Sequence, residues 1–209
     1  MQDLAVIDFE TTGLTPGIDR PTEVAIVIVR GREVVDAFSR LMNPGISIPP
    51  EVEALTGITN AMVAAAPSVG QVMTEALRFV GGRQMVSHNA AFDAAFWTHE
   101  LARIGIAATN PFLCTLRLAR RVYPQLSRHG LQALRESLQL VGEGRAHRAE
   151  ADALLTVELL GRIQRDLAAR YGLRVVTAEL LELVQSTPRG RVEEALRAHG
   201  AAADGTGGA

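Results

Sequence analysis

Residues 4–10, Leu4-Ala5-Val6-Ile7-Asp8-Phe9-Glu10, form an apolar run that leads directly into two acids. A run of this kind without helical spacing predicts a buried strand. Side chains two positions apart share one face of a strand, so the carboxylates of Asp8 and Glu10 point the same way. These like charges repel each other and lose hydration, which hard cations such as Mg²⁺ or Mn²⁺ would offset. The alternative for this pair alone is a strand end at which both acids reach water.

Strand and helix patterns alternate along the rest of the chain. The runs 22–30 and 34–42, joined by the Arg30-Gly31-Arg32 turn, predict an antiparallel meander with the first strand. Two shorter strands are predicted at 84–88 and 112–115, and the second leads into a helix. Other helices are predicted at 69–80, 90–104, 130–139 and 148–170. This alternation predicts an α/β fold with a central mixed five-stranded sheet flanked by helices.

The composition is that of an ordinary globular protein. At 209 residues and 47% hydrophobic content, the chain suits one domain with a modest appendage. The N-terminal segment carries acids and no basic cluster, and no long apolar stretch follows, so we expect neither a signal peptide nor a membrane span. The single cysteine, Cys114, cannot form an internal disulfide, which fits a cytoplasmic protein.

The distribution of charge says more than its total. The net charge of −2 argues against a protein that binds nucleic acid through an overall positive charge. Residues 101–150, however, carry 8 Arg against 3 acids. Arg117, Arg120, Arg121 and Arg128 cluster there and predict a local surface that contacts phosphates. A solvated helix face is the alternative for any one of these arginines.

A third acid follows the strand predicted at 84–88. Asp93 ends the segment Ser87-His88-Asn89-Ala90-Ala91-Phe92-Asp93, in the first or second turn of the next helix. This is near the strand end, where open α/β sheets build their sites. The favourable effect of the helix dipole on a carboxylate is the simpler explanation for Asp93 taken alone. The aromatic residues Phe92, Phe96 and Trp97 are predicted to anchor this helix to the core.

The fourth acid, Asp152, follows a histidine, His147, by five residues. Five residues of regular helix turn by roughly 500°, which leaves the two side chains about 140° apart. We therefore expect His147 in the loop before the helix and Asp152 on the helix itself. An imidazole so placed approaches the acids from outside and is suited to take a proton from water at neutral pH. A lone surface histidine is usually inert, which is the alternative for His147.

These three segments resemble the DnaQ-like 3′-5′ exonucleases of the DEDD superfamily, in the subgroup with a catalytic histidine. The matching residues are Asp8-Phe9-Glu10-Thr11-Thr12-Gly13-Leu14, then His88 to Asp93, then His147 with Asp152. The sister subgroup has a tyrosine four residues before the last Asp, where this chain has Arg148. The segments at 55–59 and 114–116 resemble the branch of the epsilon proofreading subunit of bacterial DNA polymerase III. One departure is Cys114, where many relatives carry an aspartate.

The resemblance implies a ribonuclease-H-like fold and a metal-dependent hydrolysis of phosphodiesters. Asp8, Glu10, Asp93 and Asp152 would hold two Mg²⁺ or Mn²⁺ ions about 4 Å apart, and His147 would deprotonate the attacking water. The resemblance further implies that nucleoside 5′-monophosphates leave the 3′ end of a single-stranded nucleic acid, with DNA favoured. The residues expected to contact this substrate are Thr11, Thr12, Gly13, Leu14, His88, Asn89 and Phe92. A simple turn closing the first strand is the alternative for Thr11 to Gly13.

The resemblance covers residues 3–171, so we expect an exonuclease domain at 1–172. Residues 173–209 form a helical extension with helices at 177–185 and up to residue 198, and a disordered Ala/Gly tail over the last ten residues. The apolar residues of this extension must pack on the domain, on a DNA polymerase subunit or on a second copy of the chain. Two other functions stay open: a 3′-5′ exoribonuclease on the same fold, and a non-catalytic subunit that binds a polymerase.

Overall fold

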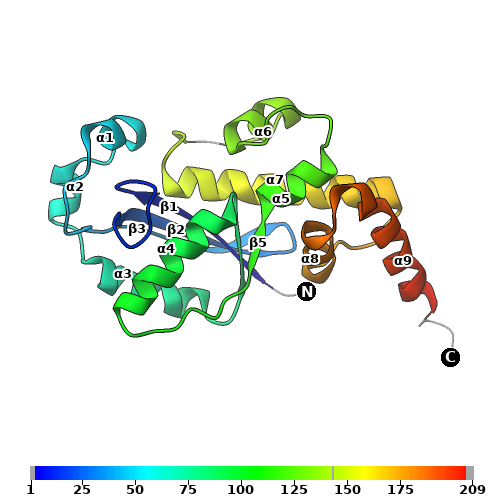
Figure 1. The fold of residues 1–209 in the computed structure, drawn as a ribbon, viewed down its shortest axis with the longest axis horizontal. Helices are drawn as coiled ribbons and strands as arrows, with labels where there is room; N and C mark the ends of the chain where they lie inside the picture. The colour runs from blue at the N-terminus through cyan, green and yellow to red at the C-terminus, as the bar shows by residue number, and fades with distance from the viewer. Residues whose placement is uncertain (1–2, 143, 206–209) are drawn as a thin grey trace.

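A central sheet with helices on both faces builds the fold, as seen in a computed structural model that describes residues 3–142 and 144–205 (Figure 1). Five strands lie in the order β3-β2-β1-β4-β5. Their bounds are β1 Leu4–Thr11, β2 Pro21–Arg30, β3 Glu33–Leu41, β4 Gln84–Ser87 and β5 Phe112–Cys114. The first three pair antiparallel, whereas β4 is parallel to β1 and β5 is parallel to β4. The predicted mixed α/β sheet is confirmed.

Alternation along β1 and β2 divides the core in two. Leu4 and Val6 face one side, where they pack against α5 (Thr115–Val122), α6 (Leu131–Leu138) and α7 (Ala149–Tyr171). The odd-numbered residues of β1 face α3 (Val69–Val80) and α4 (Ala90–Arg103) on the other side. Because side chains alternate on a strand, Asp8 and Glu10 share the face of Leu4 and Val6, toward α7.

Two short helices absent from the sequence predictions lie beyond β3. They are α1 (Pro50–Thr56) and α2 (Asn60–Ala64), found at the opposite end of the molecule from the C-terminal helices (Figure 1). A separate cluster of three buried residues, Ile48, Ile58 and Val63, holds them. The left-handed Gly57, with φ 74°, ends α1 and turns the chain toward α2.

The C-terminal extension packs on the rest of the protein. It consists of α8 (Ala178–Ser186), the short helix η1 (Arg189–Arg191) and α9 (Val192–Gly205). Helix α9 extends beyond residue 198, where the sequence placed its end, and residues 206–209 of the expected disordered tail lie outside the described residues. The buried apolar residues of the extension join the α7 side of the core: Val176, Leu180, Leu181, Val184, Val192 and Leu196.

One side chain of α8 completes the free edge of the sheet. The amide oxygen of Gln185 accepts a hydrogen bond from Cys114 N at 2.8 Å, and its amide nitrogen donates to Phe112 O at 3.3 Å. Gln185 thereby pairs with β5 as a neighbouring strand would. The division at residue 172 therefore stays a proposal, because the two parts share one core.

Truncation after Gly172 is expected to unfold the protein or lower its Tm by more than about 10 °C. Six buried apolar residues would be lost, each worth about 1.5–3 kcal/mol, and Cys114 N would lose its partner. A thermal melt of the truncated chain checks this, with a chain ending at Gly205 as the control. A truncated chain that melts like the full chain would show that the extension is an independent appendage.

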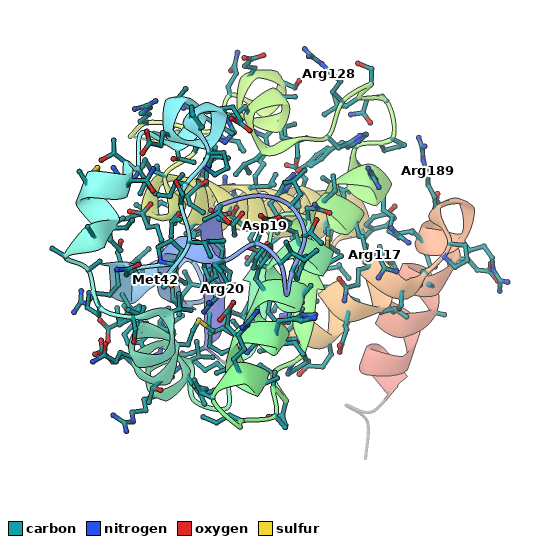
Figure 2. The ribbon with its side chains drawn as sticks, turned by 60° about the vertical axis from the view of Figure 1, so that its left-hand side comes forward. Asp19, Arg20, Met42, Arg117, Arg128 and Arg189 are labelled. Carbon is teal, nitrogen blue, oxygen red and sulfur yellow. The ribbon has the colours of Figure 1, made fainter. Side chains whose placement is uncertain are left out.

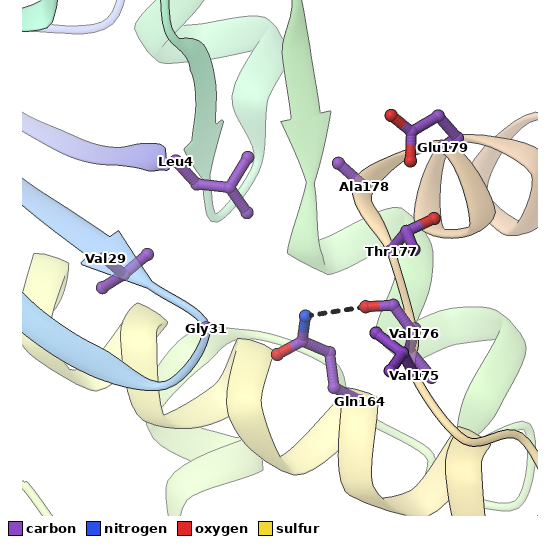
Figure 3. Close-up of a pocket in the computed structure, with 9 residues that line it drawn as sticks. All are labelled: Leu4, Val29, Gly31, Gln164, Val175, Val176, Thr177, Ala178 and Glu179. Atoms are coloured by element: carbon purple, nitrogen blue, oxygen red, sulfur yellow. Dashed lines mark hydrogen bonds between the residues drawn. The ribbon is translucent and has the colours of Figure 1, made fainter. Parts of the chain in front are cut away.

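A pocket of about 190 Å³ lies where the extension leaves α7. Leu4 and Val29 form one wall, and Val175 to Glu179, from the linker and the start of α8, form the other (Figure 3). Gln164 donates a hydrogen bond to Val176 O across the floor. It lies at the end of β1 opposite to Glu10, and no acid of the candidate site lines it. None of the described helices has the length and apolar character needed to cross a membrane.

Candidate active site

A cleft of about 590 Å³ at the carboxyl end of β1 gathers the acids that the sequence singled out. Asp8, Glu10, Asp93, His147 and Asp152 all line it. Glu10, His147 and Asp152 each offer a ligand atom, and these atoms lie within 4.8 Å of one another. Three segments far apart in the sequence therefore meet at one place.

Asp8 and Glu10 are held by β1 without an ion-paired partner among the described residues, although the charge of Arg148 partly opposes the crowding at Glu10. Neither carboxylate has a hydrogen bond among the described residues, and Glu10 is only 9% exposed. Burial raises the pKa of Glu10 to about 8, and repulsion from Asp152, Glu23 and Asp93 adds to the effect. Burial, followed by repulsion from Asp93 and Glu10, raises the pKa of Asp8 well above its usual range. Both carboxylates therefore have free lone pairs, and a bound cation would stabilise their charged forms.

Asp93 lies in the first turn of α4 and is tied to the sheet. Its Oδ1 accepts a hydrogen bond from Phe9 N at 3.2 Å, and its Oδ2 accepts one from Ser87 Oγ. Burial raises the pKa of Asp93 to about 7, although these two hydrogen bonds oppose the increase. The contacts fix the direction in which the carboxylate faces Asp8, across the junction of β1 and β4.

Asp152 lies in the first turn of α7 and holds the loop that carries His147. Its Oδ2 accepts a hydrogen bond from His147 N at 3.0 Å, and its Oδ1 accepts one from Gln132 at 3.1 Å. Burial raises the pKa of Asp152, against the effect of the His147 N–H. His147 has a left-handed backbone, with φ 61°, and its side chain is exposed at the mouth of the cleft. The imidazole is thus placed in a loop before the helix, where it meets both solvent and acids.

An ion pair between the half-exposed Arg148 and the buried Glu23 anchors this loop to the sheet. The Nε and Nη2 atoms of Arg148 donate to Glu23 at 3.0 and 2.6 Å, and Ala149 N donates to the same carboxylate at 2.9 Å. Glu23 on β2 is opposite Glu10 in the β1 register. Two guanidinium nitrogens of Arg148, the residue after His147, are therefore held against β2. Lysine, with a single side-chain nitrogen, could not reproduce this geometry.

The residues expected to contact substrate do not all line the cleft. Thr11, Gly13, Leu14, His88 and Phe92 do, whereas Thr12 and Asn89 are not among the residues that form it. The Thr12 hydroxyl instead accepts from Arg20 N at 3.0 Å and lies 3.3 Å from Asp19 Oδ1, within its own loop.

Asn89 occupies the left-handed position, φ 70°, that precedes α4. Asparagine is one of the few residues that adopt this conformation readily. Thr12 and Asn89 therefore shape the segments on which the lining residues stand.

His88 is locked by two hydrogen bonds. Its Nε2 lies 3.0 Å from the carbonyl oxygen of His129, so this nitrogen carries the proton, and its Nδ1 accepts from Thr115 Oγ1 at 3.0 Å. Burial lowers the pKa of His88 to about 4, and the positive charge of Arg120 contributes. His88 is therefore a neutral, fixed wall of the cleft and not a proton donor at neutral pH.

The second wall of the cleft comes from α1, which the sequence predictions missed. Its lining residues are Glu51, Val52, Leu55 and Thr56. Arg145, in the loop before His147, donates to the carbonyl oxygens of Ala54 and Leu55 at 3.2 and 3.4 Å and so links this wall to the histidine loop. The sequence of this region did resemble known proteins, because residues 55–59 match the branch of the epsilon proofreading subunit.

Comparison with known proteins identifies the family. The RNase_T exonuclease model matches residues 5–160. The DNA polymerase III subunit epsilon of Aquifex aeolicus is 38% identical over 169 residues, which cover 80% of this chain and 83% of that protein. The PolC-type DNA polymerase III of Clostridium perfringens is 37% identical over 76% of this chain, which spans only 11% of that much longer protein.

A solved structure agrees with the sequence matches. Exonuclease X in complex with 5′ overhanging duplex DNA superposes with a TM-score of 0.70 and 30% identity, covering 87% of this chain and 99% of that one. The ribonuclease-H-like arrangement expected from the sequence is confirmed. This chain belongs to the RNase_T family and is a DnaQ-like 3′-5′ exonuclease, a phosphodiester hydrolase similar to the epsilon subunit of DNA polymerase III.

Proposed function

We propose that the protein removes nucleotides from the 3′ end of single-stranded DNA and releases nucleoside 5′-monophosphates, in proofreading or repair. The observation that carries this proposal is the meeting of four acids and one histidine in a single cleft. The relatives support DNA over RNA, because they are named as DNA polymerase subunits and a solved relative holds duplex DNA with an overhang.

The site fits divalent cations. Its donors are carboxylate oxygens, which Mg²⁺ and Mn²⁺ prefer. Burial raises the pKa of all four acids in the metal-free protein, and repulsion from neighbouring carboxylates adds to this increase at Asp8 and Glu10. We infer that Asp8, Glu10, Asp93 and Asp152 hold two ions. When bound, such ions lower the pKa of a coordinated water and stabilise charge on the leaving oxygen.

The side chains of the cleft supply the remaining chemistry. His147 accepts the proton of the attacking water, and the water oxygen forms a bond to phosphorus as the bond to the 3′ oxygen breaks. Asp152 orients His147 through the backbone N–H of that residue. Asp93 keeps its place during the reaction because hydrogen bonds fix it to the sheet, and the neutral His88 keeps its place because Thr115 and the carbonyl oxygen of His129 hold its ring.

The rim of the cleft suits an unpaired end. Two residues that line the cleft expose large apolar side chains: Leu14, in the loop after β1, is 82% exposed, and Leu55, on α1, is 51% exposed. Such side chains contact splayed bases and do not pair with them, so the last nucleotides must leave a duplex before they enter. This arrangement favours frayed or mismatched termini over paired ones.

The test is a comparison of cleavage rates on one sequence presented as single-stranded DNA, duplex DNA, duplex with a 3′ mismatch and RNA, with Mg²⁺ or Mn²⁺ and with chelator. We expect single strands and mismatched ends to be cleaved from the 3′ end faster than paired ends, and no cleavage in chelator. Faster cleavage of RNA than of DNA would assign the protein to RNA trimming. Cleavage that persists undiminished in chelator would contradict the role of metal ions.

A further inference from the structure

A basic surface that the cleft does not include begins at its edge. Residues 101–135 hold 6 Arg and no Asp or Glu, within a chain whose net charge is −2. Three of these arginines, Arg117, Arg120 and Arg128, are exposed and have neither a salt bridge nor a side-chain hydrogen bond among the described residues. We call these three the α5 arginines, for the helix that carries Arg117 and Arg120; Arg128 lies in the loop that follows it. Their charges are available to an external anion.

Two of the α5 arginines share one face of a helix. Arg117 and Arg120 are three residues apart on α5 and therefore project from one face, opposite to the buried Leu118 and Val122. Arg128 lies in the next loop, beside His129, whose carbonyl oxygen accepts from His88 at the cleft. The charge of Arg120 also reaches His88. The surface thus starts at the wall of the cleft and follows α5 away from it.

The C-terminal extension borders this surface. Arg121 donates to Thr187 O at 2.8 Å, and Arg189 of η1 donates to Pro124 O at 2.6 Å. Figure 2 shows Arg117, Arg128 and Arg189 in the half of the view that holds α5 and the C-terminal helices. Arg121 and Arg189 therefore have structural contacts, while the three α5 arginines do not. The family model ends at residue 160, so the extension that supports this surface lies beyond it.

The chemistry of the surface indicates its ligand. A track that binds single strands stacks bases on aromatic side chains. Residues 115–131 contain one Phe, Tyr or Trp, namely Tyr123, and it is 2% exposed. Exposed arginines bind phosphate oxygens, and among residues 115–131 no exposed aromatic side chain is available to stack bases beside them. Helix α5, with 8 residues, is about 12 Å long, which matches three to four base-pair steps at about 3.4 Å per phosphate along one strand.

We propose that the α5 arginines bind the phosphate backbone of double-stranded DNA behind the single-stranded 3′ end that enters the cleft. This inference rests on the proposed function and extends it from the terminal nucleotides to the duplex upstream of them. The surface holds the duplex without regard to sequence, and the cleft takes the unpaired end.

The test compares wild type with the triple variant Arg117→Ala, Arg120→Ala and Arg128→Ala on two substrates. One is a duplex of about 16 base pairs with a short 3′ single-stranded tail, and the other is a trinucleotide with the sequence of the tail end. We expect KM for the tailed duplex to rise about tenfold or more at low salt, with kcat unchanged. The slope of log(kcat/KM) against log[salt] should become less negative by about 2 to 3. The trinucleotide should be cleaved as by wild type.

Two matched controls separate this proposal from others. The variant Arg32→Ala, Arg78→Ala and Arg174→Ala removes the same charge from exposed arginines on other elements and should change KM less than about twofold. Replacement of the α5 arginines by Lys should restore most of the affinity. Fluorescence anisotropy of the tailed duplex in chelator reads binding without cleavage, so it tests the surface even if the proposed nuclease activity fails.

Three results would overturn the proposal. One is an unchanged KM and anisotropy for the tailed duplex. Another is an equal loss on the trinucleotide, which would place the arginines in the cleft. The last is an equal loss on a single strand as long as the tailed duplex strand, which would assign the surface to single-stranded DNA.

Discussion

Asp8→Asn is expected to lower exonuclease activity by about 10³-fold or more and to raise the thermal stability of the metal-free protein. Asn keeps the size of the side chain and removes the charge that holds a cation. Asp8 has no hydrogen bond to lose among the described residues, unlike Asp93 and Asp152. The change therefore removes repulsion without leaving a donor unsatisfied, and we expect Tm in chelator to rise by about 2–8 °C.

The pH dependence of stability follows from the same crowding. Burial raises the pKa of Glu10 from 4.5 to about 8 and that of Asp93 from 3.8 to about 7, so the folded metal-free protein binds more protons than the unfolded chain in this range. The contribution of these two groups to the free energy of unfolding is fully present where both are protonated in both states, below about pH 4, and is lost as pH rises through about 7 and 8. Asp8→Asn should flatten this decline, because it removes one of the repelling charges.

Thermal melts in chelator between pH 5 and 8.5, alongside rate measurements with Mg²⁺, check both parts of the prediction. Asp36→Asn, on the exposed strand β3, is the control and should change neither activity nor Tm. A variant of Asp8 that is inactive but less stable than wild type would show that the carboxylate stabilises the fold, contrary to the cation-binding interpretation.

The sequence predicted the acids of the site because their positions depend on local patterns. Asp8 and Glu10 share a face wherever a strand forms, and Asp93 follows a strand end by a fixed number of residues. His147 was expected outside the helix because a regular helix cannot bring it beside Asp152. These arguments need only the backbone geometry of one element at a time, which residue spacing determines.

The contacts that position the site could not be predicted in this way. Glu23 and Arg148 are 125 residues apart, and nothing local to either one indicates the other. Helix α1 has only 7 residues and buries one of them, Thr56, so its sequence lacks the periodicity that predicts longer helices. It is held instead by the small cluster around Ile58. Tertiary contacts of this kind decide the walls of the cleft.

His147→Ala is expected to lower kcat by about 10² to 10⁴, the usual loss for a general base, with little change in the metal concentration needed for half-maximal activity. The imidazole also lies within 4.8 Å of ligand atoms of Glu10 and Asp152, so it could instead hold a cation. The two roles predict different properties for the His147→Ala variant. Loss of a base removes the increase of rate with pH that depends on an unprotonated imidazole, whereas loss of a ligand raises the metal requirement.

His99→Ala is the matched control, because His99 is an exposed histidine on α4 whose ring, among the described residues, hydrogen-bonds only to its own helix, at Ala95 O. Arg148→Ala tests the positioning of the loop, since it keeps His147 and removes the ion pair with Glu23. We expect a smaller loss of kcat, about tenfold, with the pH dependence of wild type retained, because the imidazole is still present but less well held. If His147→Ala turned over normally and kept the same pH dependence, the base would have to be another group, and the exposed imidazole beside Asp152 would have no part in proton transfer.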